Sequence, residues 1–173
     1  MANGQNTEEV TLGTGVLSLN DVPVGFLKGD VTLVINREQK AFESGIPLTV
    51  RKRVIIRESA ALRAQMAQIY SDKLAFALGA GVITTPSPGS SKFSFGGDSD
   101  IDEFALKFVH NVPNSNGTIT VVLFKAQPQT QLEIPFREED FLMYNVEYGA
   151  SADDTKNPGE QLGYVLFEGF TSS

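Results

Sequence analysis

Apolar and polar residues alternate along much of this 173-residue chain, and this alternation limits the folds that it can adopt. In DVTLVIN, Val31, Leu33 and Ile35 fall on one face of an extended strand, with polar residues opposite. EFALKFV and DFLMYNVEYG repeat the pattern, and clusters rich in Gly, Asn and Pro separate such runs. A period of two is typical of half-buried strands. We therefore predict seven to nine strands in an antiparallel sandwich or partly closed barrel.

One segment has a different period, and it predicts a single helix in this mainly β (α+β) chain. In ESAALRAQMAQIYSDKLAFALG, apolar residues recur at spacings of three and four from Leu62 to Leu78. Ser59 is a suitable N-cap and Gly79 a suitable C-terminal stop, so the helix is expected at about residues 59–78. Because one face alone is apolar, we expect this helix to cover the flank of a sheet.

Length and composition favour one globular domain, since 41% of the residues are hydrophobic and 20% are charged. Residues 1–9 are polar and predict a flexible N-terminal arm, which leaves residues 10–173 as the domain. The net charge of −7 disfavours tight binding to DNA phosphates. The lack of Cys excludes disulfides and thiolate metal sites. No segment predicts a signal peptide or a bilayer span.

Few residues point to catalysis, and we expect no enzyme, no cofactor and no metal site. The single histidine, His110, could act as a general base, but a surface position beside a turn is the simpler interpretation. Asp98, Asp100 and Asp102 resemble the start of a calcium loop, although Glu103 stands where that loop needs Gly. A solvated acidic turn is favoured over a weak cation site. Paired carboxylates of a glycosidase would lack a Trp platform for the sugar.

Residues 48–57, within LTVRKRVIIRE, predict a strand with two unlike faces. The set expected in the core is Leu48, Val50, Val54 and Ile56, and the opposite set is Arg51, Arg53, Ile55 and Arg57. One interpretation is an edge strand that its charges protect from aggregation. The other is a basic surface that meets an acidic one, such as another copy of the chain. Composition does not separate the two.

The segment before this strand, residues 36–48, is polar with a Ser-Gly break, and it predicts a long loop or an extended hairpin. In the second interpretation the basic strand contacts a neighbouring molecule, and the family resemblance given below implies that this segment does so too. The candidate contact residues are Arg37, Glu38, Phe42, Glu43, Ile46, Arg51, Arg53 and Arg57. The candidate acidic partners are Asp98, Asp100, Asp102, Glu138 and Glu139.

The chain resembles the major tail tube proteins of long-tailed bacteriophages over most of its layout. The resemblance lies in GVLSLNDVPVGFLKGDVTLVINRE, then a polar loop, then VRKRVIIRESAALRAQMAQIYSDKLAFALG and a β-rich C-terminal half. That family opens with a strand pair of the form G-x-L-x-L-x-x-x-x-V-G-x-L-K. The matching residues are Gly15, Leu17, Leu19, Val24, Gly25, Leu27 and Lys28.

The resemblance implies a structural protein of the virion, located in the phage tail and synthesised in the host cytoplasm. Its partner would be itself, in hexameric rings that stack into a hollow tube and join their inner sheets into one barrel. A long loop, here about residues 36–48, would reach neighbouring subunits. The tube would hold a tape-measure protein, meet other tail proteins and conduct DNA without specific binding, with no membrane involved. An acidic lumen would let DNA slide, because adhesion grows with the number of phosphates neutralised.

Two other functions stay open at this point. A monomeric β-sandwich binding module, such as a capsid decoration or a carbohydrate- or protein-binding domain, is the main alternative. A lipocalin-like barrel around a small apolar ligand is disfavoured, because strand lengths are uneven and a helix interrupts the meander.

Overall fold

The computed structural model describes seven ranges of the chain, namely residues 15–25, 27–67, 71–97, 100–113, 116–129, 131–136 and 143–169. The expected N-terminal arm at residues 1–9 lies outside these ranges, and the single domain at residues 10–173 stays a prediction. Ten strands and one helix are described, which exceeds the seven to nine strands expected, because several are only two to four residues long.

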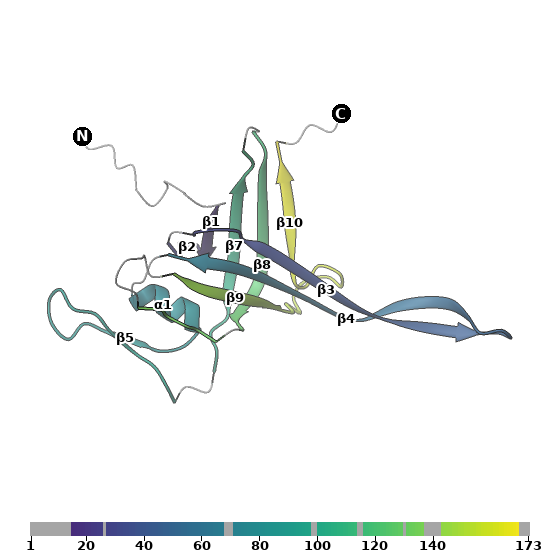
Figure 1. Cartoon of the computed structure of the whole chain (residues 1–173), viewed down its shortest axis with the longest axis horizontal. Coiled ribbons are helices and arrows are strands. Elements are labelled where there is room, and N and C mark those ends of the chain that lie inside the picture. Colours follow the sequence, from purple (N-terminus) through teal and green to yellow (C-terminus); the bar gives the residue numbers. More distant parts are fainter. Residues whose placement is uncertain are drawn as a thin grey trace.

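The elements follow one another along the chain as Figure 1 shows. They are β1 (Val16–Leu19), β2 (Val22–Pro23), β3 (Thr32–Ser44), β4 (Thr49–Met66), α1 (Ser71–Leu78), β5 (Val82–Thr84), β6 (Lys92–Ser94), β7 (Phe104–Asn111), β8 (Thr118–Pro128), β9 (Tyr144–Ser151) and β10 (Gly163–Glu168). Eight strands form one antiparallel sheet in the order β2-β1-β7-β8-β9-β4-β3, with β10 also paired to β8. Strands β5 and β6 form a separate hairpin. The predicted antiparallel β architecture with one flanking helix is confirmed.

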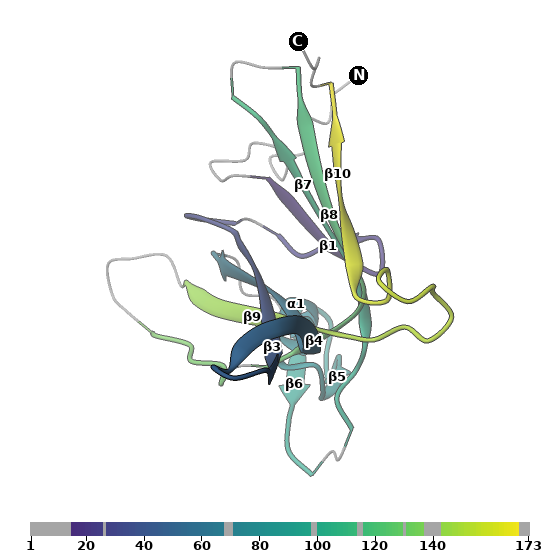
Figure 2. The same ribbon diagram turned by 90° about the vertical axis from the view of Figure 1, so that its right-hand side faces the viewer.

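Strand β8 changes partner along its length, and this change divides the large sheet into two layers. Residues 118–123 of β8 pair with β10, whereas residues 125–128 pair with β9. The register with β7 shifts at the same place, so that both Leu123 and Ala126 are buried although they are three residues apart. Figure 2 shows the layers diverging. We term them the β10 layer (β2-β1-β7-β8-β10) and the β3 layer (β9-β4-β3).

The core lies between these layers and is built by the alternation seen in the sequence. Strand β7 buries Phe104, Leu106 and Phe108, the apolar residues that alternate in EFALKFV. Strand β9 buries Tyr144, Val146 and Tyr148, one of the two alternating sets in DFLMYNVEYG, and Leu142, which belongs to the same set, lies outside the described ranges. Further core residues are Leu17, Leu19, Leu62, Ala64, Met66 and Val121. Val31 and Leu33 pack partly against the core, but Ile35 is exposed, contrary to the prediction.

The helix is shorter than predicted and begins later. Residues 59–66, expected to be helical, instead belong to strand β4, so Ser59 lies within a strand and is not an N-cap. The physical reason is that the apolar residues of this stretch fit both the period of a helix and the period of a strand. Ala60, Leu62, Ala64 and Met66 alternate as buried residues, and β4 pairs with β3 on one side and β9 on the other. Helix α1 spans Ser71–Leu78 only, and Gly79 ends it with φ 69°, as expected of a C-terminal stop.

Helix α1 packs at one end of the core and ties both layers together. The Tyr148 hydroxyl on β9 donates a hydrogen bond of 3.2 Å to the carbonyl oxygen of Phe76. The Phe76 ring meets that of Phe104 on β7 edge to face, with centroids 5.3 Å apart. Ala77 is buried. The expected role of the helix, covering the flank of the sheet, is therefore confirmed.

Residues 36–48 are not a long loop, and the other expectation, an extended hairpin, is confirmed. Strands β3 and β4, of 13 and 18 residues, pair along their whole shared length and are closed by a turn at residues 45–48. The outer part of this pair stands clear of the body (Figure 1). We term residues 36–58 the projecting hairpin.

The prediction that residues 48–57 have a core face is wrong. Leu48 is 70% exposed, Val50 and Ile56 are exposed, and Val54 is only half-buried. The reason is that this part of β4 has β3 as its one strand neighbour in the described chain, and no layer covers it. Two register shifts, between Glu38 and Gln39 and between Phe42 and Glu43, also interrupt the simple alternation.

Candidate interaction surface

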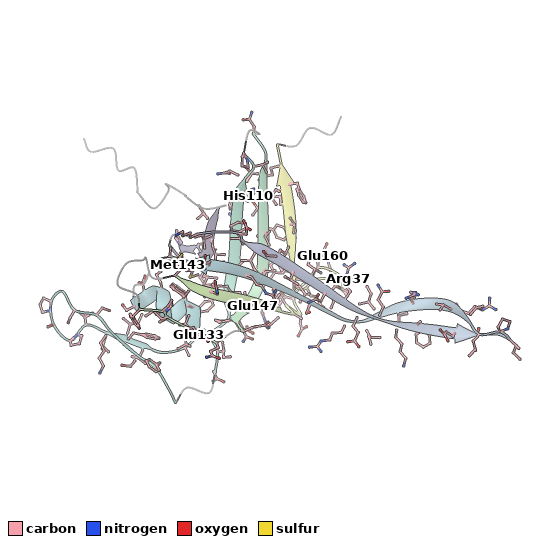
Figure 3. The ribbon with its side chains drawn as sticks, viewed as in Figure 1. Arg37, His110, Glu133, Met143, Glu147 and Glu160 are labelled. Carbon is pink, nitrogen blue, oxygen red and sulfur yellow. The ribbon has the colours of Figure 1, made fainter. Side chains whose placement is uncertain are left out.

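The projecting hairpin holds all eight residues predicted to contact neighbours, from Arg37 to Arg57. Its base is fixed by the cross-strand pair Arg37 and Glu58, whose Nε and carboxylate oxygen are 2.8 Å apart. Figure 3 shows Arg37 where the hairpin leaves the body. Near the tip, the Arg51 guanidinium donates a hydrogen bond of 3.3 Å to the Ser44 hydroxyl, so the two strands are linked at both ends.

The hairpin exposes several large apolar side chains along its length. Those exposed are Phe42, Ile46, Leu48, Val50, Ile55 and Ile56. Apolar side chains that are grouped in this way, and not scattered singly, mark a surface that binds another molecule. A two-stranded ribbon that packs on nothing is also only marginally stable in water. The composition of the hairpin therefore fits a segment that gains its packing from another molecule.

The hairpin is also basic, although the whole chain is acidic. Residues 36–58 contain six arginines and lysines and three glutamates, against a net charge of −7 for the chain. Arg51, Lys52, Arg53 and Arg57 are all exposed. Because the register shifts at Gln39 and Glu43 interrupt the alternation, the arginines are not confined to one face, as the sequence pattern suggested. The hairpin is better described as a basic rod with apolar patches.

The two predicted acidic partners that the structure describes, Asp100 and Asp102, lie on another part of the molecule from the hairpin. Asp100 and Asp102 are exposed and precede β7, and the Asp102 backbone N–H donates a 2.7 Å hydrogen bond to the Gly79 carbonyl at the end of α1. Helix α1 and β5 lie on the opposite side of the body from the hairpin (Figure 1). Asp98, Glu138 and Glu139 lie outside the described residues. A contact between the hairpin and Asp100 or Asp102 would therefore join two copies.

Strand β10 forms a second exposed apolar surface, at the edge of the β10 layer. In the described chain it has β8 as its one strand neighbour, and Tyr164, Leu166 and Phe167 are exposed on it. An apolar strand at a sheet edge is a template for pairing with another chain. The opposite edge of the same layer is formed by β1 and the two-residue β2.

A cleft of about 380 Å³ lies between the two layers on the side where β10 and β3 do not pair. Leu33 and Ile35 of β3 form one wall, and Leu162 and Val165 form the other. Val121 of β8 lies between them. The two layers are therefore open along this line, and the cleft between them is lined by polar groups, among them Arg37 and Glu58, as well as by apolar ones.

The single histidine and the potential metal ligands are the groups from which the sequence could have built a reactive site. The His110 ring, near the end of β7, stacks on the ring of Phe108 with centroids 6.5 Å apart (Figure 3). Within the described ranges, no three metal-ligating side chains gather as a metal site would require. That the chain is not an enzyme and binds no cofactor stays a prediction.

Sequence reasoning missed the exposed apolar residues that make these surfaces, above all Leu48, Val50 and Ile56 on the hairpin and Tyr164 on β10. Alternation alone does not distinguish a core face from an exposed one. The signal in the sequence that could have revealed the hairpin was the length of its two strands. Residues 31–66 contain one Gly-Pro turn signal, at residues 45–47, which leaves strands two to three times longer than the usual five or six residues.

A scan against protein-family models finds no match, and a search of curated proteins finds no significant match either. In the part of the chain that the structure describes, no helix has the length and apolar character needed to cross a bilayer.

Proposed function

We propose that this chain is a structural protein that assembles with copies of itself, as the major tube subunit of a bacteriophage tail. The observation that carries the proposal is the projecting hairpin, which exposes apolar and basic side chains that no described part of its own chain covers. Exposing such a surface is costly for an isolated protein unless a partner buries it. The resemblance of residues 15–28 to the opening strand pair of tail tube proteins indicates which kind of assembly this is.

The edges of the β10 layer support a ring. One edge is β10 and the other is β1 with β2, so the edges are different and lie on opposite sides of the layer. Pairing one edge with the other edge of the next copy is a heterologous contact, and such contacts close into rings when the rotation allows. A closed ring of this kind removes every exposed edge of the layer.

The hexameric symmetry, the stacking of rings, and the passage of a tape-measure protein and DNA come from the resemblance. The charge of the chain fits that role. With a net charge of −7, most tube surfaces would repel phosphates, so DNA would pass without adhering. In the same proposal the protein resides in the virion, after synthesis in the host cytoplasm.

Negative-stain electron microscopy with light scattering tests the proposal on the purified, concentrated protein. We expect rings or hollow tubes of even diameter. A matched variant replaces residues 39–56 with Asn-Gly, a pair that closes two-residue hairpins. It joins Glu38 to Arg57, which are already cross-strand partners. This variant should remain folded by circular dichroism and should form no tubes. Normal tubes from the shortened variant would contradict the role given to the hairpin.

The second candidate function is a monomeric β-sandwich binding module, and the cleft beside β10 favours it. An opening of about 380 Å³, lined by both apolar and polar side chains, is within the size range of ligand sites. This function predicts a protein that stays monomeric at every concentration tested and binds a ligand saturably. Replacing Leu162 with Trp would then block binding, whereas the tail tube proposal predicts no saturable small-molecule site.

A further inference from the structure

We propose that the projecting hairpin of one copy docks on the opposite end of a second copy, where the β5–β6 hairpin and the acidic segment before β7 lie. We term residues 80–97 and 100–103 the acidic end. The inference rests on the proposed function and deepens it. The proposed function requires that copies associate, and the inference names the surface that receives the hairpin.

Charge complementarity is the first support. The hairpin has six basic residues against three acidic ones, whereas the acidic end has three acidic residues and one lysine. Asp100, Asp102 and Glu103 are exposed in the structure. Opposite charges on two separate surfaces steer association and fix its orientation. Two copies meeting hairpin to hairpin would instead bring like charges together.

Apolar exposure on the acidic end is the second support, because a charged surface alone would give a weak contact. Phe95 is 77% exposed, and Val82, Ile83 and Ile101 are the other exposed large apolar residues of the acidic end. These side chains match in kind the exposed Phe42, Leu48 and Ile56 of the hairpin. Burying both sets would supply the hydrophobic part of the free energy of association.

The position of the two surfaces is the third support. They lie toward opposite ends of the longest axis of the molecule (Figure 1). The hairpin extends about eight residues per strand beyond Arg37 and Glu58, which is about 25 Å of reach at roughly 3.3 Å per residue. It points away from the acidic end of its own chain. When the hairpin of one copy docks on the acidic end of a second copy, the acidic end of the first and the hairpin of the second remain available. This is the condition for continued assembly.

Cross-linking tests the contact directly, because the chain has no Cys and any introduced thiol is unique. Two single variants, Val50→Cys on the hairpin and Phe95→Cys on the acidic end, are mixed before assembly and treated with a short bis-maleimide. Both positions are exposed, so neither change should affect folding. The control mixture pairs Val50→Cys with Tyr164→Cys, which places the second thiol on the edge strand β10 beside the cleft.

We expect at least tenfold more cross-linked dimer from the Val50 and Phe95 mixture than from either variant alone or from the control mixture. Assembled tubes that cross-link through Tyr164 and not through Phe95 would overturn this inference and leave the proposed function standing. A protein that remains monomeric by light scattering and cross-links through neither pair would contradict both.

Charge reversal gives an independent measurement. Arg51→Glu with Arg53→Glu should reduce the assembly rate at low salt at least tenfold, and Asp100→Lys with Asp102→Lys should do the same. Mixing the two reversed proteins should restore the rate, because each reversed hairpin then finds a reversed acidic end. An assembly rate that stays low in the mixture would contradict the pairing of these surfaces. Lys92→Glu, which adds to the charge of the acidic end, should not reduce the rate.

Discussion

Arg63 on β4 and Glu147 on β9 are cross-strand partners, and the Arg63 guanidinium donates hydrogen bonds of 2.9 and 3.4 Å to the two Glu147 carboxylate oxygens. A similar cross-strand pair, Arg37 and Glu58, lies further out, at the base of the projecting hairpin. The first pair joins strands within the body, and the second joins strands that leave it. The two ion pairs therefore report on different parts of the molecule.

A double-mutant cycle on Arg63→Gln and Glu147→Gln should give a coupling energy of about 0.2–1 kcal/mol in urea unfolding, because Arg63 is largely exposed and water screens the pair. Added salt should reduce this coupling. The same cycle on Arg37→Gln and Glu58→Gln should give almost no coupling in global unfolding, since the hairpin can open while the body stays folded. Equal couplings for the two pairs would mean that the hairpin unfolds together with the body.

Two truncations on strand β4 should differ sharply in their cost. Leu62 is fully buried, so Leu62→Ala should lower the free energy of unfolding by about 2–5 kcal/mol. Ile55, on the hairpin, is about half exposed, and Ile55→Ala should change it by less than about 0.5 kcal/mol in the monomer. Chemical denaturation of both variants measures the difference. A large cost at Ile55 would show that the hairpin packs on its own body in solution.

Alkaline pH should destabilise the protein through its buried tyrosines. Burial, with a smaller effect of the Asp72 carboxylate, raises the pKa of Tyr144 to about 12, and burial also raises the pKa of Tyr148. An unfolded chain releases the phenol proton near pH 10, while the folded chain retains it. The stabilising effect is thus complete below about pH 10 and is lost as the pH rises towards 12, by at most about 1.4 kcal/mol per pH unit for each tyrosine.

Urea unfolding from about pH 8 to about pH 11.5 measures this dependence. Tyr144→Phe should lower stability at neutral pH but give a shallower decline above about pH 10, because one titrating group is gone. Asp72→Asn, which removes the minor cause of the raised pKa and keeps the phenol, should leave the decline nearly unchanged. Parallel curves for the wild type and Tyr144→Phe would contradict the assignment.

Strand β10 depends on a glycine at its start. A Cβ on Gly163 would lie 2.1 Å from the Val122 carbonyl oxygen of β8, too close for any side chain. Gly163→Ala should therefore push β10 away from β8 and cost about 1–3 kcal/mol of stability. Hydrogen exchange should show faster exchange in residues 163–168 than in β7. Glu168→Ala, at the far end of β10, is the matched control and should change little.

The sequence predicted most of the body, because there each alternating pattern faces a second layer. Phe104, Leu106 and Phe108 are an example of such a pattern. The end of the helix at Gly79 was also predicted. The helix boundary was wrong because Ala60, Leu62 and Met66 suit a helix in isolation, and pairing of β4 with two neighbours overrides that preference. The surface was only partly predictable. Its charged residues were found, but Leu48 and Ile56 looked like core, since a local pattern carries no information about whether a second layer exists.

Val16 pairs with Val109, so the first described strand leaves the ribosome long before its partner. The hairpins β3–β4 and β7–β8 need only local contacts, whereas β1 must wait for a loop of about ninety residues to close. Strand β10 is the last of the described strands to be translated. A nascent chain therefore displays its projecting hairpin early and its β10 edge late. Because β10 is made last among the described strands, an unfinished subunit lacks the edge that we propose for the ring contact and could not enter a ring.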